Sequence, residues 1–219
     1  MPRALFEKTG RAVWISHLDL MRLFQRAFKR AELPLTHTQG FNPRPSVSIA
    51  LPLSVGIESC CELLDFDLEG EKVANEEILR RLNENLVEGI RILKVYDDFC
   101  KIKNLAYLDC VLSLEYDDGF PGQAEELLME LFAREEVIVE KRTKNGPKPE
   151  NIIPLIKTFS IDAVDEHVMQ LHARVCCQNP ALNPMQIVVA IEQYLPELKP
   201  DFVKCRREEI YDTNESVFR

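Results

Sequence analysis

The order in which strand-like and helix-like hydrophobic patterns follow one another limits most strongly how this chain can fold. Segments with a two-residue period, typical of strands, alternate with segments of helical period. The first half predicts strands near 3–7, 12–15, 47–51, 58–68 and 90–96, and helices over 16–32 and 75–86. The second half predicts strands near 106–114, 136–141, 155–161, 168–176 and 202–210, and helices near 121–134 and 184–195. The patterns therefore indicate an α+β protein.

The two halves share this β-α-β-β-α-β order, although their sequences do not repeat. Such an order fits the ferredoxin-like arrangement, in which two helices cover one face of an antiparallel sheet. We therefore predict two tandem ferredoxin-like halves with antiparallel sheets, residues 1–98 and 105–213.

The helix predicted over residues 16–32 is amphipathic. Ser16 can cap its first turn, and Asp19 three positions later can return the bond and face the positive end of the helix dipole. Its predicted buried stripe is Leu20, Leu23, Phe24, Ala27, Phe28 and Ala31, and its predicted outer face carries Arg22, Arg26, Lys29 and Arg30.

Charge is spread unevenly along the chain. The net charge is −9, yet residues 1–48 hold eight basic and three acidic residues, a balance of +5, so the remainder carries −14. An acidic body with one basic face repels stray polyanions while that face binds one. An ordinary solvated helix face is the alternative, and the charge pattern alone leaves both open.

Two loops carry further candidate binding residues. Residues 36–45 place Phe41 beside Asn42 and Arg44, residue types that stack on a base and grip a phosphate. The alternative is a rigid crossover in which Phe41 is buried. Residues 141–149 contain turn dipeptides and no apolar side chain, which predicts an exposed loop. This second basic cluster comprises Lys141, Arg142, Lys144 and Lys148.

Several kinds of chemistry lack their sequence signature. The chain has neither a glycine-rich phosphate loop nor a Cys-x-x-Cys pair, so we expect no cofactor and no metal site. His17 lies in the first helical turn, where a neutral imidazole could serve as a general base or simply as a structural hydrogen bonder. Seven cysteines in apolar stretches, with no leader-like or membrane-spanning stretch, predict a reduced cytoplasmic protein.

A set of motifs in the first 56 residues resembles a known bacterial family. The motifs are Phe6-Glu7-Lys8 with Gly10, Trp14-Ile15-Ser16-His17-Leu18-Asp19, Arg26-Ala27, Gly40-Phe41-Asn42-Pro43-Arg44-Pro45 and Ala50-Leu51-Pro52-Leu53 with Gly56. They resemble the radical-SAM-associated domain of unknown function, found beside or fused behind cobalamin-binding-type radical SAM proteins. The resemblance reappears at residues 141–144, but residues 151–154 read Asn-Ile-Ile-Pro where the family has Asp-x-Arg-Pro.

The resemblance implies a radical SAM protein as partner and a role near RNA. The chain lacks the Cys-x-x-x-Cys-x-x-Cys of a radical SAM cluster, so radical chemistry would belong to that partner. The same motifs more distantly resemble the ferredoxin-like endoribonucleases that process CRISPR repeats. Those nucleases carry a glycine-rich loop near the C-terminus, and residues 196–219 contain no glycine.

We therefore predict a non-catalytic accessory protein that binds tRNA or rRNA for a radical SAM enzyme. The outer face of the first helix would contact phosphates, Phe41 would stack, Arg44 would clamp, and the second basic cluster would extend the track. Two alternatives remain: a protein-interaction module that docks the radical SAM partner, and a metal-independent endoribonuclease that uses His17 as its base.

Overall fold

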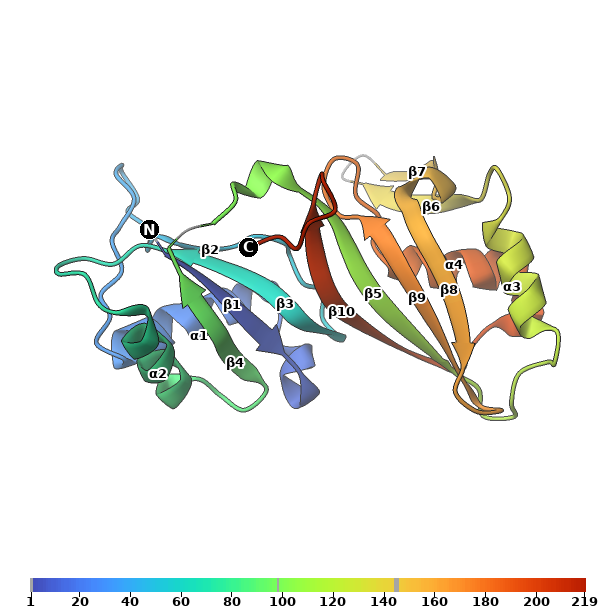
Figure 1. Ribbon diagram of the computed structural model, residues 1–219, viewed down its shortest axis with the longest axis horizontal. Helices are drawn as coiled ribbons and strands as arrows, with labels where there is room; N and C mark the ends of the chain where they lie inside the picture. Colours follow the sequence, from blue (N-terminus) through green and yellow to red (C-terminus); the bar gives the residue numbers. More distant parts are fainter. Residues whose placement is uncertain (1, 98, 144–145) are drawn as a thin grey trace. The chain divides into compact units, whose positions relative to one another are not determined.

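Two units make up the chain in the computed structural model, which describes residues 2–97, 99–143 and 146–219 (Figure 1). The first unit is Met1–Lys103 with Arg219, and the second is Asn104–Phe218. The described residues contain four α-helices and antiparallel strand pairs in both units, which confirms the α+β class. The domain limit predicted at residue 98 falls on a position outside the described residues.

The first unit alternates strands and helices. Its elements are β1 (Arg3–Lys8), η1 (Gly10–Trp14), α1 (His17–Arg30), β2 (Val47–Ile49), β3 (Ile57–Phe66), α2 (Asn75–Asn85) and β4 (Ile90–Tyr96). β1 lies between β4 and β3, and all pairs are antiparallel. β2 pairs with β3 residues that also pair with β1, so it lies on the other side of β3. The order in space is β4-β1-β3-β2.

Helices α1 and α2 pack on one face of these strands, where they bury the core of the first unit (Figure 1). Phe6 of β1 meets Phe24 of α1 edge to face at 4.9 Å, and Phe28 meets Phe66 of β3 at the same centroid distance. Such aromatic pairs add to the stabilisation from burial itself. The predicted stripe of α1 is confirmed, except that Leu23 is only half-buried.

The second unit repeats the order with an added hairpin. Its elements are β5 (Leu105–Glu115), α3 (Ala124–Phe132), β6 (Ile138–Thr143), β7 (Gly146–Asn151), η3 (Ile153–Leu155), β8 (Ile156–Ala163), β9 (Val168–Cys176), α4 (Met185–Tyr194), η4 (Pro196–Leu198) and β10 (Phe202–Asp212), after the short η2 (Ile102–Asn104). The sheet order is β10-β5-β9-β8, with every pair antiparallel. The β6–β7 pair forms a separate two-stranded ribbon.

The strand predicted over residues 12–15 is wrong, because these residues belong to the 3₁₀ helix η1 or follow it directly. Gly10 turns the chain with φ +55°, and Ala12 then donates to the Thr9 carbonyl. Beneath the turn the buried Lys8 ammonium donates to the carbonyls of Val13 and Ile15 at 3.1 and 2.8 Å. Bonds to these carbonyls hold the segment in a turn before α1 rather than in a sheet.

The loop conformation predicted over residues 141–149 is also wrong, since strands β6 and β7 take up its described part, although Pro147, Lys148 and Pro149 are exposed as predicted. Pro147 and Pro149 lie in β7 although proline cannot donate to a ladder. Their spacing of two lets both occupy positions whose N–H would point away from the partner strand. A two-stranded ribbon therefore tolerates both prolines.

No disulfide joins the seven cysteines. Among the residues that the structure describes, no helix is both long and apolar enough to cross a bilayer.

Candidate functional site

Helix α1 carries four cations on its outer face, and we call Arg22, Arg26, Lys29 and Arg30 the α1 ridge. All four side chains are exposed, as predicted. The helix begins after Ser16, whose hydroxyl accepts from the Asp19 N–H at 3.2 Å and donates to the Asp19 carboxylate at 2.8 Å. The predicted cap is confirmed, although the Asp19 carboxylate bonds the hydroxyl instead of the Ser16 backbone.

The four cations of the α1 ridge differ in the hydrogen bonds and ion pairs that they form. Arg22 forms an ion pair with Asp19 at 3.0 Å, and Arg30 donates to the Asn85 carbonyl at 3.2 Å. The Ser16 hydroxyl and then Arg22 hold the pKa of Asp19 below its ordinary value. Arg26 and Lys29 form no hydrogen bond or ion pair with any residue that the structure describes. These two cations face water without a direct ionic contact among the described residues, although the charge of Arg26 also helps to lower the pKa of Asp19.

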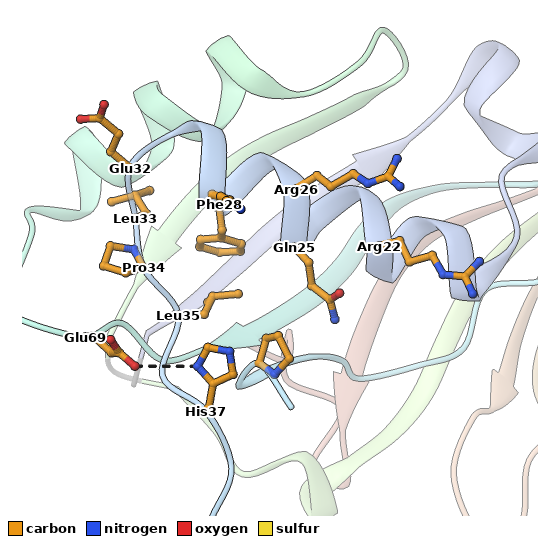
Figure 2. Close-up of a pocket in the computed structure, with 12 residues that line it drawn as sticks. Arg22, Gln25, Arg26, Phe28, Glu32, Leu33, Pro34, Leu35, His37 and Glu69 are labelled. Atoms are coloured by element: carbon orange, nitrogen blue, oxygen red, sulfur yellow. Dashed lines mark ion pairs between the residues drawn. The ribbon is translucent and has the colours of Figure 1, made fainter. Parts of the chain in front are cut away.

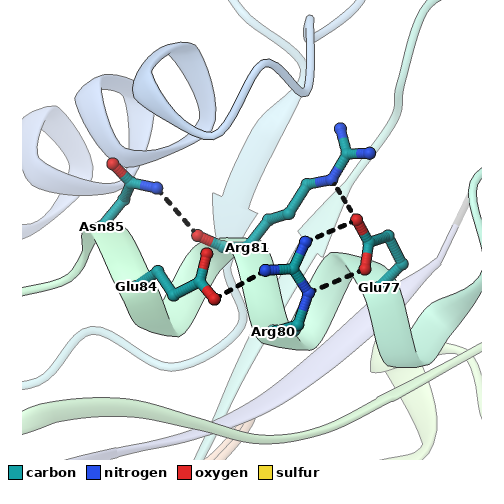
Figure 3. Close-up of polar contacts among 5 residues, drawn as sticks. All are labelled: Glu77, Arg80, Arg81, Glu84 and Asn85. Atoms are coloured by element: carbon teal, nitrogen blue, oxygen red, sulfur yellow. Dashed lines mark hydrogen bonds and ion pairs between the residues drawn. The ribbon is translucent and has the colours of Figure 1, made fainter.

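Helix α2 shows the opposite arrangement (Figure 3). Arg80 donates to both oxygens of Glu77 at 2.7 and 2.9 Å and to Glu84 at 2.6 Å, and Arg81 donates to Glu77 at 2.6 Å. Bonds from Arg80 and then Arg81 lower the pKa of Glu77 to about 2. The cations of α2 are thus neutralised within their own helix, and those at the centre of the α1 ridge are not.

Two of the eight basic residues in the N-terminal segment are not on the surface. Arg3 is fully buried and forms a two-pronged contact with Asp65 at 2.5 and 3.0 Å. Lys8 is also fully buried, beneath the start of α1. The net charge of residues 1–48 therefore includes two cations that are not on the surface. Most of the exposed basic residues of this segment lie on α1.

A groove of about 830 Å³ runs along one flank of α1 (Figure 2). We call it the α1 groove, and it is lined by Arg22, Gln25, Arg26, Phe28, Lys29, Glu32, Leu33, Pro34, Leu35, His37, Pro45 and Glu69. Figure 2 shows Phe28 and Leu35 between α1 on one side and His37 with Glu69 on the other. The floor is apolar, and the charged groups stand at its rim.

The wall opposite α1 is held by backbone pairing. Leu35 forms an isolated bridge with Leu68, Glu69 N–H donates to the Pro34 carbonyl at 2.8 Å, and Thr36 N–H donates to the Asp67 carbonyl at 3.0 Å. His37 and Glu69 stand at the end of this wall, with 3.8 Å between His37 Nδ1 and Glu69 Oε1. The sequence pattern did not reveal Gln25, His37 or Glu69 as site residues.

A second hollow of about 540 Å³ lies on the other flank of α1. It is lined by Ile15, Asp19, Arg22, Leu23, Arg26, Arg30 and Val87. Arg22 and Arg26 line both hollows, so the α1 ridge separates two depressions of the surface.

The loop after the groove wall exposes its aromatic residue. Thr38 N–H donates to the Arg44 carbonyl at 2.8 Å, and Arg44 N–H donates to the Thr38 hydroxyl at 3.0 Å, which closes the loop at its base. Phe41 at the tip is 103% exposed, and Asn42 and the Arg44 side chain are exposed as well. The alternative in which Phe41 is buried is therefore wrong.

His17 and the second-unit candidates lie in less open surroundings. His17 is half-buried, and its Nδ1 finds no partner among the described residues. Lys141 contacts Glu150 at 2.9 Å and donates to the Ala181 carbonyl at 2.9 Å, so it is already engaged, whereas Lys148 is exposed. Lys144 and the side chain of Arg142 lie outside the described residues. Among the residues described, no group of His, Cys, Asp and Glu side chains is placed to hold a metal.

Residues 2–184 match a family described as "Uncharacterized protein conserved in bacteria (DUF2344)". The chain belongs to this family. The match takes in the whole first unit up to Lys103, with the α1 ridge and the α1 groove, and continues into the second. No curated protein matches the chain.

Two solved structures resemble the chain at very low sequence identity. One, a crystal structure of a Cbf5-Nop10-Gar1 complex, has 9% identity and a TM-score of 0.51 over 95% of this chain and 48% of the other. This DUF2344 member thus spans about half the length of that protein, and the likeness concerns the α+β fold alone. The other, an unknown protein from Galdieria sulphuraria, has 11% identity, 94% and 96% coverage, and a TM-score of 0.26, too low to indicate a shared fold.

Proposed function

We propose that this protein is a non-catalytic RNA-binding accessory factor of the bacterial cytoplasm that works with a radical SAM enzyme. The observation that supports RNA binding is the α1 ridge, where Arg26 and Lys29 are exposed and form no hydrogen bond or ion pair with the described residues. Exposed guanidinium and ammonium groups along a helix are suited to neutralise the phosphates of a nucleic acid.

The rest of the molecule supports a local site rather than general affinity for polyanions. The chain carries a net charge of −9, and the basic residues of α2 are neutralised by Glu77 and Glu84. An acidic body disfavours nucleic acid over most of the surface, so binding would be confined to local basic groups such as the α1 ridge. Phe41 and Arg44, exposed on the loop after the groove wall, are suited to stack on a base and to hold a phosphate.

The radical SAM partner rests on the motif resemblance, and the cytoplasmic location on seven cysteines without a disulfide. A tRNA or rRNA is the RNA class that this resemblance favours. Lys148, exposed on β7 of the second unit, is a further candidate for a phosphate contact.

We also assign each unit to the ferredoxin-like fold. In the first unit the strands run β4-β1-β3-β2 with α1 and α2 as crossovers. In the second, β10-β5-β9-β8 repeats the order, with α3 and α4 in the same places and the β6–β7 ribbon inserted before β8. The same connectivity in both units supports this assignment.

The test is RNA binding by filter retention at about 50 mM and about 200 mM salt. Four phosphate contacts predict an affinity that falls by about 100-fold over this range, and two contacts predict a fall of about 10-fold. We expect the first value for the wild type and the second for Arg26→Glu/Lys29→Glu, with weaker binding at both salts. Arg91→Glu/Lys94→Glu makes the same charge change on exposed positions of β4 and should bind as the wild type does. Equal loss in both double variants would refute a local site.

Partner docking without RNA is the second candidate, and exposed apolar side chains favour it. Trp14, at the end of η1, is 68% exposed, and Leu18, in the first turn of α1, is 67% exposed. Exposed apolar patches of this kind mark protein contacts. Purified radical SAM partner that binds the wild type but not Trp14→Ala/Leu18→Ala, with no RNA bound even at low salt, would select this role. Specific RNA cleavage lost in His17→Ala would instead select the nuclease.

A further inference from the structure

We propose that the α1 groove holds one unpaired nucleotide of the bound RNA, turned outward so that its base lies in the groove and its phosphate on the α1 ridge. This inference rests on the proposed RNA-binding function and specifies the form of RNA that the site takes.

The size and lining of the groove fit a nucleobase. Its volume of about 830 Å³ lies in the range of small-molecule sites. Phe28, Leu33 and Leu35 lie buried beneath it, and Pro34 and Pro45 bring apolar surface to its opening. The faces of a base gain from an apolar surface only when they are not already stacked on neighbouring bases. A base inside a duplex has no free face. The groove therefore favours an unpaired nucleotide over a continuous helix.

The charges at the rim set the direction in which such a nucleotide lies. Arg22 and Arg26 stand on α1, whereas Glu69 on the opposite wall and Glu32 just past the C-terminal end of α1 carry negative charge (Figure 2). A phosphate is attracted to the first group and repelled by the second. The phosphate thus belongs on the α1 ridge, and the base points toward the wall formed by Leu35 and His37.

Polar groups that line the groove can meet the edge of a base. The Gln25 amide both donates and accepts, and the Glu69 carboxylate accepts. Glu69 and His37 are 3.8 Å apart, beyond ordinary hydrogen-bond length, so the carboxylate remains available to a base. Amide and carboxylate side chains are the types that read base edges.

The second hollow offers a place for the RNA backbone next to the nucleotide in the α1 groove. Because Arg22 and Arg26 line both the α1 groove and the hollow across the ridge, one phosphate can lie between them while the strand continues on the far side. A strand that crosses the ridge thereby presents a single nucleotide to the groove.

The experiment compares a short RNA duplex that has one single-nucleotide bulge with the fully paired duplex of the same strand length, at low salt. Stacking of one base predicts that the wild type binds the bulged RNA about 10-fold more tightly. Gln25→Trp fills the groove from α1 without altering any charge, and it should bind both RNAs with the affinity of the paired duplex. Gln123→Trp makes the same replacement at an exposed position before α3, outside the groove, and should keep the preference.

A 2-aminopurine base at the bulge provides a reading that does not depend on the variant. Its fluorescence in the complex with the wild type should differ from that in the free RNA, because the base would be stacked on protein side chains. Equal affinity of the wild type for both RNAs, with strong salt dependence retained, would overturn the groove proposal and leave the RNA-binding function intact. Absence of binding to either RNA would refute the proposed function and this inference with it.

Discussion

The buried ion pair between Arg3 and Asp65 makes a sharp prediction about the stability of the first unit. The Arg3 side chain is fully buried, the Asp65 side chain is 12% exposed, and their two contacts are 2.5 and 3.0 Å long. Arg3 also donates to the Cys100 carbonyl at 2.9 Å and lies over the Phe99 ring at 4.3 Å. Removal of Arg3 alone leaves a carboxylate in a site that water scarcely reaches.

The size of the effect follows from that geometry. Breaking one side of a buried ion pair costs about 3–5 kcal/mol, because the remaining charge has lost both water and partner. Arg3→Met should therefore lower the free energy of unfolding by about 3–5 kcal/mol, a large share of the 5–15 kcal/mol typical of a domain. Arg3→Met/Asp65→Leu removes both charges and fills the space with apolar atoms. The double variant should recover most of the loss.

Urea denaturation of the wild type, both single variants and the double variant measures this coupling as a double-mutant cycle. We expect the double variant to be more stable than Arg3→Met. Strictly additive losses would refute the argument, since additivity means that the two side chains do not stabilise each other. The denaturant dependence of the transition should be alike in all four proteins, because the surface exposed on unfolding is nearly the same.

Two further predictions concern titration and thiol reactivity. Because the pKa of Glu77 is lowered from 4.5 to about 2, its pairing with Arg80 and Arg81 contributes stability that is present above pH 4.5 and is lost as pH falls through 2. In Arg80→Gln the carboxyl midpoint of Glu77, followed by carbon NMR, should rise toward 4.5; an unchanged midpoint would contradict the pairing. Burial raises the pKa of the Cys110 thiol and raises that of Cys205 to about 12, so neither should react with a disulfide reagent near pH 8 before unfolding. Cys100 is exposed and should react first, and mass spectrometry of labelled peptides would reveal any other order.

Helix α1 was predictable because its determinants are local. Ser16 and Asp19 define its start, and the apolar residues at helical spacing define its buried side. The remaining positions, which carry the cations, must then form its outer face. The helix begins and ends within two residues of the predicted limits. Its role in binding stays a prediction.

The α1 groove was not predictable because its wall depends on contacts between distant parts of the chain. Leu35 forms a β-bridge with Leu68, and Thr36 N–H donates to the Asp67 carbonyl. No local pattern near residue 35 predicts a partner more than thirty positions away. The same holds for Arg3, which looks like a surface cation until Asp65 is placed beside it. Buried charges of this kind are invisible to patterns that treat every arginine as exposed.

The closed base of the loop after the groove wall has a consequence for how this family can diversify. Thr38 and Arg44 bond each other twice, so the five residues between them leave and rejoin the fold at one fixed point. The backbone pairing that holds the groove wall involves residues 34–36 and lies outside this closure. Insertions, deletions or transplanted sequences at 39–43 can therefore change what the tip touches without disturbing the core. The loop is a natural place for evolution, or a protein engineer, to alter recognition while the scaffold stays the same.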